Sequence, residues 1–221
     1  MLHSFTYSAV QPESPRHTTL VGGFHFPLMI EFSYSQTAGT MIFEQYYLEC
    51  LSQASYLIGD KSSGKAIVID PRRDISPYLH TAELHGLSIE WILETHFHAD
   101  FVSGHLELAK KTKANIGLSS EANAEFDFTA LDNGHLIQLG DITCEVLHTP
   151  GHTPESMCVV VTDKSNGEDP WAIFTGDTMF IGDVGRPDLL VSINRSAKEL
   201  ASELYDSCLL YTSDAADEEA W

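Results

Sequence analysis

The chain is short of positive charge. Its 221 residues include 12 lysines and arginines against 32 aspartates and glutamates, which gives a formal net charge of −20. Nucleic acids and anionic membrane surfaces are themselves negatively charged, so this balance argues against both as partners. To bind an anionic substrate, the chain would have to gather positive charge locally. Each arginine near a pocket therefore becomes a candidate for substrate binding.

Cysteine and long apolar runs are also scarce. The four cysteines show neither a CxxC spacing nor a dense framework, which favours free thiols in a reducing cytoplasm. No apolar run reaches the roughly 18 residues that a membrane-spanning helix needs, and the apolar-rich stretch 20–32 is a poor signal peptide. A hydrophobic content of 43% indicates a globular chain. We expect a cytoplasmic protein that binds small molecules and that can form homo-oligomers.

Three segments differ in character. Residues 1–40 are rich in Ser, Thr, Pro and Gly without a sustained period, so we expect a leader that is not part of the fold. Residues 41–207 are regular and are expected to form the domain, incomplete at its C-terminus. Residues 208–221 resemble the conceptual translation of sequencing-adapter DNA, which predicts an artefactual tail. A short acidic tail is the alternative.

Hydrophobic periodicity from residue 41 onward predicts strands interspersed with helices. The expected helices cover residues 75–85 with Gly86 as C-cap, about 104–113 with Ser103 as N-cap, and 195–206. The expected strands cover residues 42–51, 55–59, 65–70, 89–94, 115–118, 135–139, 142–147, 157–162 and 171–175. Meander-like strands with helices between them indicate an α/β fold in layers around a mixed sheet.

A cluster of metal-binding side chains follows the strand expected at 89–94. His96, His98 and Asp100 occupy alternate positions, so in an extended segment all three can point toward one place. Imidazole suits zinc, iron, copper and nickel, and an added carboxylate favours a hard or borderline ion. Phe101 stands where a further ligand could be expected. The cluster predicts a metalloenzyme.

Two later motifs join this cluster. His152 lies just after a Pro150-Gly151 turn that follows a strand, and a tight turn presents an imidazole rigidly. Asp177 ends another apolar strand, where Gly176 allows a close backbone approach. Taken alone, each residue has a plainer interpretation, a turn histidine or a capping aspartate. Together, and all at strand ends, they predict one metal site.

The motifs His96-Phe97-His98-Ala99-Asp100, Thr149-Pro150-Gly151-His152-Thr153 and Gly176-Asp177 resemble those of the metallo-β-lactamase superfamily. The resemblance covers roughly residues 41–206. It implies an α/β fold of the αβ/βα sandwich type, with the metal site at one edge of two packed sheets. We expect this sandwich to be truncated at its C-terminus.

The position of Phe101 separates this chain from part of that superfamily. Hydrolases such as glyoxalase II usually carry an HxHxDH motif and bind two metals, and Phe101 replaces the last histidine of that motif. A two-metal site needs both ions fully ligated, so the replacement argues against binuclear hydrolysis. His105 could in principle compensate, although a histidine satisfied within its helix is the simpler interpretation.

The segments 98–105 (HADFVSGH) and 182–188 (GDVGRPD) are similar to persulfide dioxygenases of the bacterial type often fused to rhodanese domains. The resemblance implies one Fe²⁺ held by His96, His152 and Asp177, a facial set that leaves open positions for a thiolate and O₂. His98 and Asp100 would then support catalysis beside the metal.

Arg186 is the candidate substrate-binding residue that this resemblance implies. Its guanidinium would pair with a carboxylate of a glutathione-like persulfide. The alternative is a loop arginine in a surface ion pair.

The leading hypothesis is an iron-dependent persulfide dioxygenase that oxidises a low-molecular-weight thiol persulfide with O₂ to sulfite and thiol. One alternative is a glyoxalase II-like thioester hydrolase with Zn²⁺. A second is an inactive, truncated metal-binding fragment. The resemblance also suggests a rhodanese domain in the intact protein. It does not identify the thiol that carries the persulfide.

Overall fold

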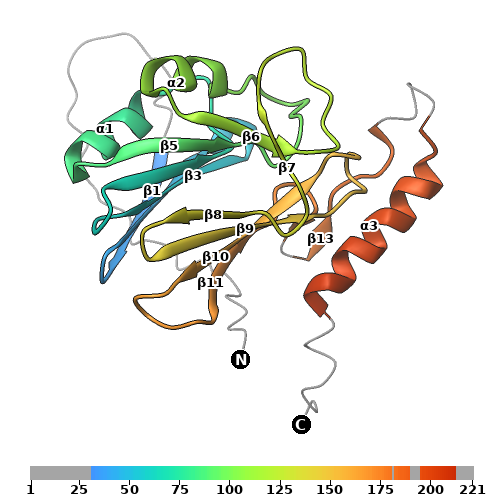
Figure 1. Ribbon diagram of the computed structural model, residues 1–221. Helices are drawn as coiled ribbons and strands as arrows, with labels where there is room; N and C mark the ends of the chain where they lie inside the picture. Colours follow the sequence, from blue (N-terminus) through green and yellow to red (C-terminus); the bar gives the residue numbers. More distant parts are fainter. Residues whose placement is uncertain (1–30, 181, 190–194, 213–221) are drawn as a thin grey trace, which may run out of the picture.

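The computed structural model describes residues 31–180, 182–189 and 195–212, and in these the chain forms two β-sheets that face each other (Figure 1). The larger sheet has the strand order β1-β2-β3-β4-β5-β6-β7, antiparallel from β1 to β4 and parallel from β4 to β7. Its strands are β1 (Glu31–Ala38), β2 (Met41–Leu48), β3 (Gln53–Asp60), β4 (Lys65–Ile69), β5 (Ser88–Leu93), β6 (Asn115–Ser119) and β7 (Thr129–Leu131). A short 3₁₀ turn, Glu49–Leu51, joins β2 to β3.

The second sheet is antiparallel and has the order β11-β10-β9-β8. Its strands are β8 (Leu136–Leu139), β9 (Ile142–His148), β10 (Met157–Asp163) and β11 (Pro170–Phe174). A small ladder pairs β12 (Met179–Phe180) with β13 (Asp183–Val184). The predicted layers and the mixed sheet are confirmed.

Strand β4 shows why the larger sheet lies in the middle of the molecule. Ile67 and Ile69 belong to the core between the sheets, together with Val146 of β9. Ala66 and Val68 point the other way, into a second core beneath the helices. A strand covered on both faces has a nearly continuous apolar sequence, and full burial of one isoleucine contributes about 1.5–3 kcal/mol. The carboxyl end of β4 is thereby firmly held.

The helices α1 (Ser76–His85) and α2 (His105–Thr112) cover the outer face of the larger sheet, where Tyr78 and Leu108 pack into the second core (Figure 1). The C-cap predicted for α1 is confirmed. Gly86 has a left-handed φ of 65°, and its amide donates to the carbonyl oxygens of Ala82 and Glu83.

The N-cap of α2 lies one residue after the predicted position. Gly104 occupies the cap position, and Ser103 precedes it. The Ser103 hydroxyl oxygen still accepts from the His105 amide at 3.2 Å, and its one hydrogen faces the carboxylate of Glu94, at 2.7 Å, and the carbonyl of Pro71, at 2.9 Å. The Ser103 side chain therefore connects the start of α2 to Glu94.

The N-terminal boundary also differs from the sequence-based expectation. Strand β1 pairs with β2 along its whole length, from Glu31 opposite Leu48 to Ala38 opposite Met41. The sheet thus begins before residue 41, and the expected boundary at residue 40 is corrected. The Ser-, Thr- and Gly-rich composition of this segment hid a period-2 alternation of aromatic and polar residues at 32–35. Residues 1–30 of the expected leader lie outside the described residues.

Helix α3 (Ala197–Thr212) packs against the turn that precedes His152. The Ser207 hydroxyl donates to the carbonyl of Pro150 at 2.7 Å, and a Cβ at Gly151 would collide with the backbone of Leu204. The helix extends beyond the expected boundary at residue 207, while residues 213–221 of the expected tail lie outside the described residues. Within the described part of the chain, no helix has the length and apolar character that crossing a membrane requires.

Candidate metal centre

Three loops bring metal-binding side chains to one edge of the two sheets. His96 follows β5, His152 follows β9 and Asp177 follows β11. Because β9 and β11 are both antiparallel to β10, their carboxyl ends lie at the same edge of the second sheet. The topology therefore gathers residues that are far apart in the sequence.

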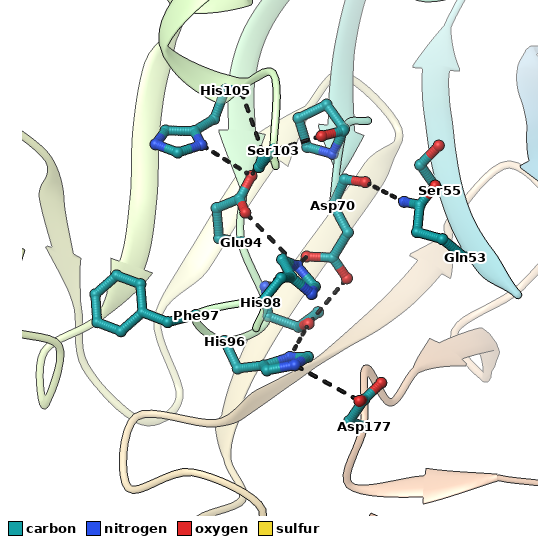
Figure 2. A network of polar contacts seen from close by, with 12 residues as sticks. Gln53, Ser55, Asp70, Glu94, His96, Phe97, His98, Ser103, His105 and Asp177 are labelled. Carbon is teal, nitrogen blue, oxygen red and sulfur yellow. Dashed lines mark hydrogen bonds and ion pairs between the residues drawn. The ribbon is translucent and has the colours of Figure 1, made fainter. Parts of the chain in front are cut away.

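His96, His152 and Asp177, here called the metal triad, offer ligand atoms that all lie within 4.8 Å of one another. The Oδ2 atom of Asp177 lies 3.7 Å from Nε2 of His96 and 3.5 Å from Nε2 of His152. Figure 2 shows His96 and Asp177 pointing toward each other. The structure thus brings together the three residues that the sequence predicted as ligands.

A glycine allows the two loops of the triad to touch. Gly176 has a left-handed φ of 50°, and a Cβ at this position would collide with the side chain of Thr95. A side chain there would push the Asp177 loop away from the His96 loop. Glycine is therefore the residue that this close approach requires.

The hydrogen bonds of His96 fix which of its nitrogens faces the triad. The Thr95 hydroxyl donates to Oδ2 of Asp70 at 2.8 Å, because a carboxylate only accepts. The same hydroxyl lies 3.0 Å from Nδ1 of His96 and is left to accept a hydrogen from it. Nε2 of His96 is then unprotonated and presents its lone pair to Asp177.

His152 is oriented in the same way through a backbone group. Its Nδ1 lies 3.1 Å from the carbonyl oxygen of Arg186, which can only accept, so Nδ1 carries the hydrogen. The lone pair of Nε2 again faces Asp177. Both histidines thus present the nitrogen that a metal ion needs.

Burial agrees with this arrangement. Burial lowers the pKa of His96 to about 3, and the neighbouring charge of His98 acts in the same direction. Burial also raises the pKa of Asp177, although the nearby histidines oppose that effect. The imidazole of His96 is therefore neutral at physiological pH, as a metal ligand must be.

A second group of buried residues lies beside the triad. It consists of Asp70, Glu94 and His98, here called the carboxylate cluster, with ligand atoms also within 4.8 Å of one another. Nε2 of His98 lies 3.1 Å from Oδ1 of Asp70 and 3.6 Å from Oε2 of Glu94 (Figure 2). Asp70 also accepts hydrogen bonds from the Thr95 amide and hydroxyl. Asp70 therefore connects the cluster to the triad.

The carboxylate cluster has its own charge pattern. Burial alone would lower the pKa of His98, but Asp70 and Glu94 raise it to about 9. Burial and the charge of Asp70 raise the pKa of Glu94 to about 8, against the effect of His98. The pKa of Asp70 is instead lowered, because His98 and the Thr95 amide overcome the effect of its burial. At neutral pH the cluster therefore holds a charged imidazolium.

The sequence analysis did not find Asp70 or Glu94. Both are acidic residues directly after an apolar strand, β4 and β5. These two strands are parallel neighbours, and Asp70 donates its backbone amide to the carbonyl of Leu93. The available signal was the recurrence of an acid at the same position after two adjacent strands.

The remaining predicted residues take different places. Asp100 is exposed, and its charge raises the pKa of both His98 and Asp177, so it lies near both groups. The ring of Phe101 packs on the ring of His98, with 4.3 Å between their centroids. His105 does not join the triad, since its Nδ1 lies 3.6 Å from Glu94.

Arg186 reaches the site through its backbone. Its guanidinium is exposed and pairs bidentately with Asp188, at 2.7 and 3.0 Å, as in the alternative interpretation of the sequence. Its carbonyl oxygen is the group that orients His152. A role for the guanidinium in substrate binding stays a prediction.

Comparisons with known proteins place this site in a family. A model of the metallo-beta-lactamase superfamily matches residues 48–219. The chain is similar to the cytoplasmic hydroxyacylglutathione hydrolase of Arabidopsis thaliana, with 38% identity over 146 residues, 64% of this chain and 55% of that protein. It is also similar to the mitochondrial persulfide dioxygenase ETHE1 of Homo sapiens, with 30% identity over 167 residues, 71% of this chain and 61% of that protein.

Among solved structures, the chain is similar to a metallo-beta-lactamase from Staphylococcus aureus subsp. aureus COL. The TM-score is 0.71 and the identity 42%, over 76% of this chain and 51% of that one. The chain thus spans between 51% and 61% of the length of these three relatives. The family model covers most of the chain, and the fold class predicted from the motifs is confirmed. The chain belongs to the metallo-beta-lactamase superfamily.

Proposed function

We propose that the chain is an iron-dependent persulfide dioxygenase domain that acts in the cytoplasm. In this reaction a thiol persulfide, O₂ and water give sulfite, the free thiol and two protons. The sulfur that becomes sulfite is oxidised, and O₂ is reduced. Glutathione persulfide is the simplest substrate of this class.

The observation that carries the proposal is the composition of the metal triad. His96 and His152 each present an unprotonated Nε2, and Asp177 presents a carboxylate oxygen. Two imidazoles and one carboxylate are the ligand set of many non-haem Fe²⁺ oxygenases, so the residues present fit this ion. Bound Fe²⁺ would supply the activation of O₂, which Zn²⁺ has no redox chemistry to do.

The residues around the triad would orient the ligands and the substrate. Asp70, acting through Thr95, fixes the tautomer of His96, and the carbonyl of Arg186 fixes that of His152. We propose that Asp100, exposed beside the triad, contacts substrate or water there. The Arg186 guanidinium would leave Asp188 to pair with a carboxylate of the thiol carrier.

A second candidate is a zinc-dependent thioester hydrolase of the glyoxalase II type. The similarity to the Arabidopsis thaliana hydroxyacylglutathione hydrolase, at 38% identity, favours it. Phe101 is the objection, because a phenylalanine offers no ligand atom to a second metal ion. Oxygen consumption separates the two candidates, since thioester hydrolysis uses none.

The test uses the full 221-residue chain, loaded anaerobically with Fe²⁺ or with Zn²⁺. We expect the iron form to consume O₂ with glutathione persulfide and to release equimolar sulfite, with no activity in the zinc form. A His152→Ala variant serves as the control for metal loss. Hydrolysis of S-lactoylglutathione by the zinc form, without O₂ uptake on persulfide, would contradict the proposal. If a folded, metal-loaded chain has neither activity, the result supports the inactive-fragment interpretation.

A further inference from the structure

His98 lies close to the metal triad but is not part of it. Its ring centroid is 4.3 Å from that of His96, so distance alone does not keep it from a metal ion bound there. Nevertheless, the ligand atoms that gather with His96 are those of His152 and Asp177, and Nε2 of His98 gathers with Asp70 and Glu94. Some other feature of the fold must keep His98 apart.

The hydrogen bonding of His98 supplies that feature. Nε2 lies 3.1 Å from Oδ1 of Asp70, and Oε2 of Glu94 lies 3.6 Å from the same nitrogen. The Asp70 carboxylate already accepts from the Thr95 amide and hydroxyl and can only accept, so Nε2 of His98 carries the hydrogen of the 3.1 Å contact. A protonated nitrogen has no lone pair to give to a metal ion.

The two carboxylates are themselves held in place. Asp70 accepts from the Thr95 amide at 2.7 Å and from the Thr95 hydroxyl at 2.8 Å. Glu94 accepts from the Ser103 hydroxyl at 2.7 Å. Both carboxylates are at least 95% buried, so water does not compete for His98. Phe101 packs on the ring of His98 and restrains it further.

We propose that Asp70 and Glu94 are positioning residues that hold Nε2 of His98 away from the metal and so limit the ligand set to two histidines and one carboxylate. The inference deepens the proposed function, on which it rests for the identity of the metal triad. It assigns Glu94 a role through His98, without contact between Glu94 and the metal. If the contacts of Asp70 and Glu94 with Nε2 are weakened, His98 becomes a third histidine ligand of the metal.

The test measures metal ligation and needs no turnover. Zinc affinity is determined by competition with a chelator, and the visible spectrum of the Co²⁺-substituted protein reports the ligand set. We expect Glu94→Gln to tighten zinc binding about 10-fold or more, since changes around a metal site commonly alter affinity by about 10–100-fold. Its Co²⁺ spectrum should change to that of a site with one more nitrogen ligand. Asp70→Asn should change the Co²⁺ spectrum in the same direction, but its gain in zinc affinity should be smaller, because it also alters the hydrogen bond through Thr95 that orients His96.

Two controls make the outcome specific. His98→Ala alone should leave zinc affinity within about threefold of the unmodified chain, and Glu94→Gln combined with His98→Ala should lose the gain. Glu90→Gln, on the strand that precedes Glu94 and in an exposed pair with Lys65, should change nothing. Far-UV circular dichroism and a thermal melt identify any variant that fails to fold.

Two results would overturn the inference. One is a loss of zinc affinity above about tenfold in His98→Ala, which would make His98 a ligand of the unmodified protein. The other is an unchanged affinity and Co²⁺ spectrum in folded Glu94→Gln and Asp70→Asn. Neither readout depends on persulfide or O₂, so a chain without dioxygenase activity could still confirm or overturn it.

Discussion

The metal triad and the carboxylate cluster use the same residue types for opposite purposes. The triad has two histidines to one carboxylate, and the cluster has two carboxylates to one histidine. Burial lowers the pKa of His96 to about 3, whereas Asp70 and Glu94 raise that of His98 to about 9. These two histidines are two positions apart in the chain. The ratio of carboxylates to imidazoles around each ring therefore decides whether it can serve as a ligand or carries a charge.

The largest expected effect comes from removing a triad residue. His152→Ala should reduce bound metal from about one ion per chain to nearly none, because two ligands do not hold a divalent ion tightly. His105→Ala, beside the carboxylate cluster, should retain about one ion per chain. Elemental analysis of both purified variants gives the comparison. Metal loss in His105→Ala would mean that His105 replaces the ligand that Phe101 cannot provide.

The sequence predicted the triad better than the cluster, for a physical reason. His96, His152 and Asp177 stand in motifs with recognisable local surroundings, such as the Pro150-Gly151 turn. Asp70 has no such surroundings. Only the parallel pairing of β4 with β5 places its carboxylate beside Thr95. Long-range pairing of this kind leaves no local pattern to find.

Backbone roles and β1 were beyond sequence analysis for a similar reason. Any residue at position 186 would supply the carbonyl that orients His152, so this contact cannot be inferred from the type of residue at that position. Most strands and helices from residue 41 onward were predicted within a few residues, because their cores impose clear periodicity. The short strands β7, β12 and β13 and the last turns of α3 were not predicted. Strand β1 was missed because the composition around it resembles a linker.

An intermediate effect is expected in the pH dependence of the metal-free chain. The pKa of His98 is raised from 6.5 to about 9, so its stabilisation is complete below pH 6.5 and is lost as the pH rises through 9. The pKa of His96 is lowered from 6.5 to about 3, so stability is lost as the pH falls from 6.5 toward 3. The two histidines thus act on opposite limbs of the stability profile.

Replacing each histidine by glutamine separates the acidic and alkaline limbs of the dependence of stability on pH. His98→Gln should flatten the alkaline limb, and His96→Gln the acidic one, each by on the order of 1–3 kcal/mol in the free energy of unfolding. Urea unfolding at several pH values between 4 and 10 measures both. If both variants flattened the same limb, the assignment of opposite charge states to the two regions would be wrong.

The smallest expected effect concerns Arg186, which contacts the triad only through its backbone carbonyl. Arg186→Ala keeps the carbonyl that orients His152, so metal content and kcat should not change. An exposed ion pair such as that with Asp188 is weak, and losing a contact of similar strength with an anionic persulfide would raise KM by about fivefold at most. Asp188→Asn, which frees the guanidinium, should lower KM or leave it unchanged. Metal loss in Arg186→Ala would show that the side chain helps to place the loop, and the orientation of His152 could then no longer be assigned to the carbonyl alone.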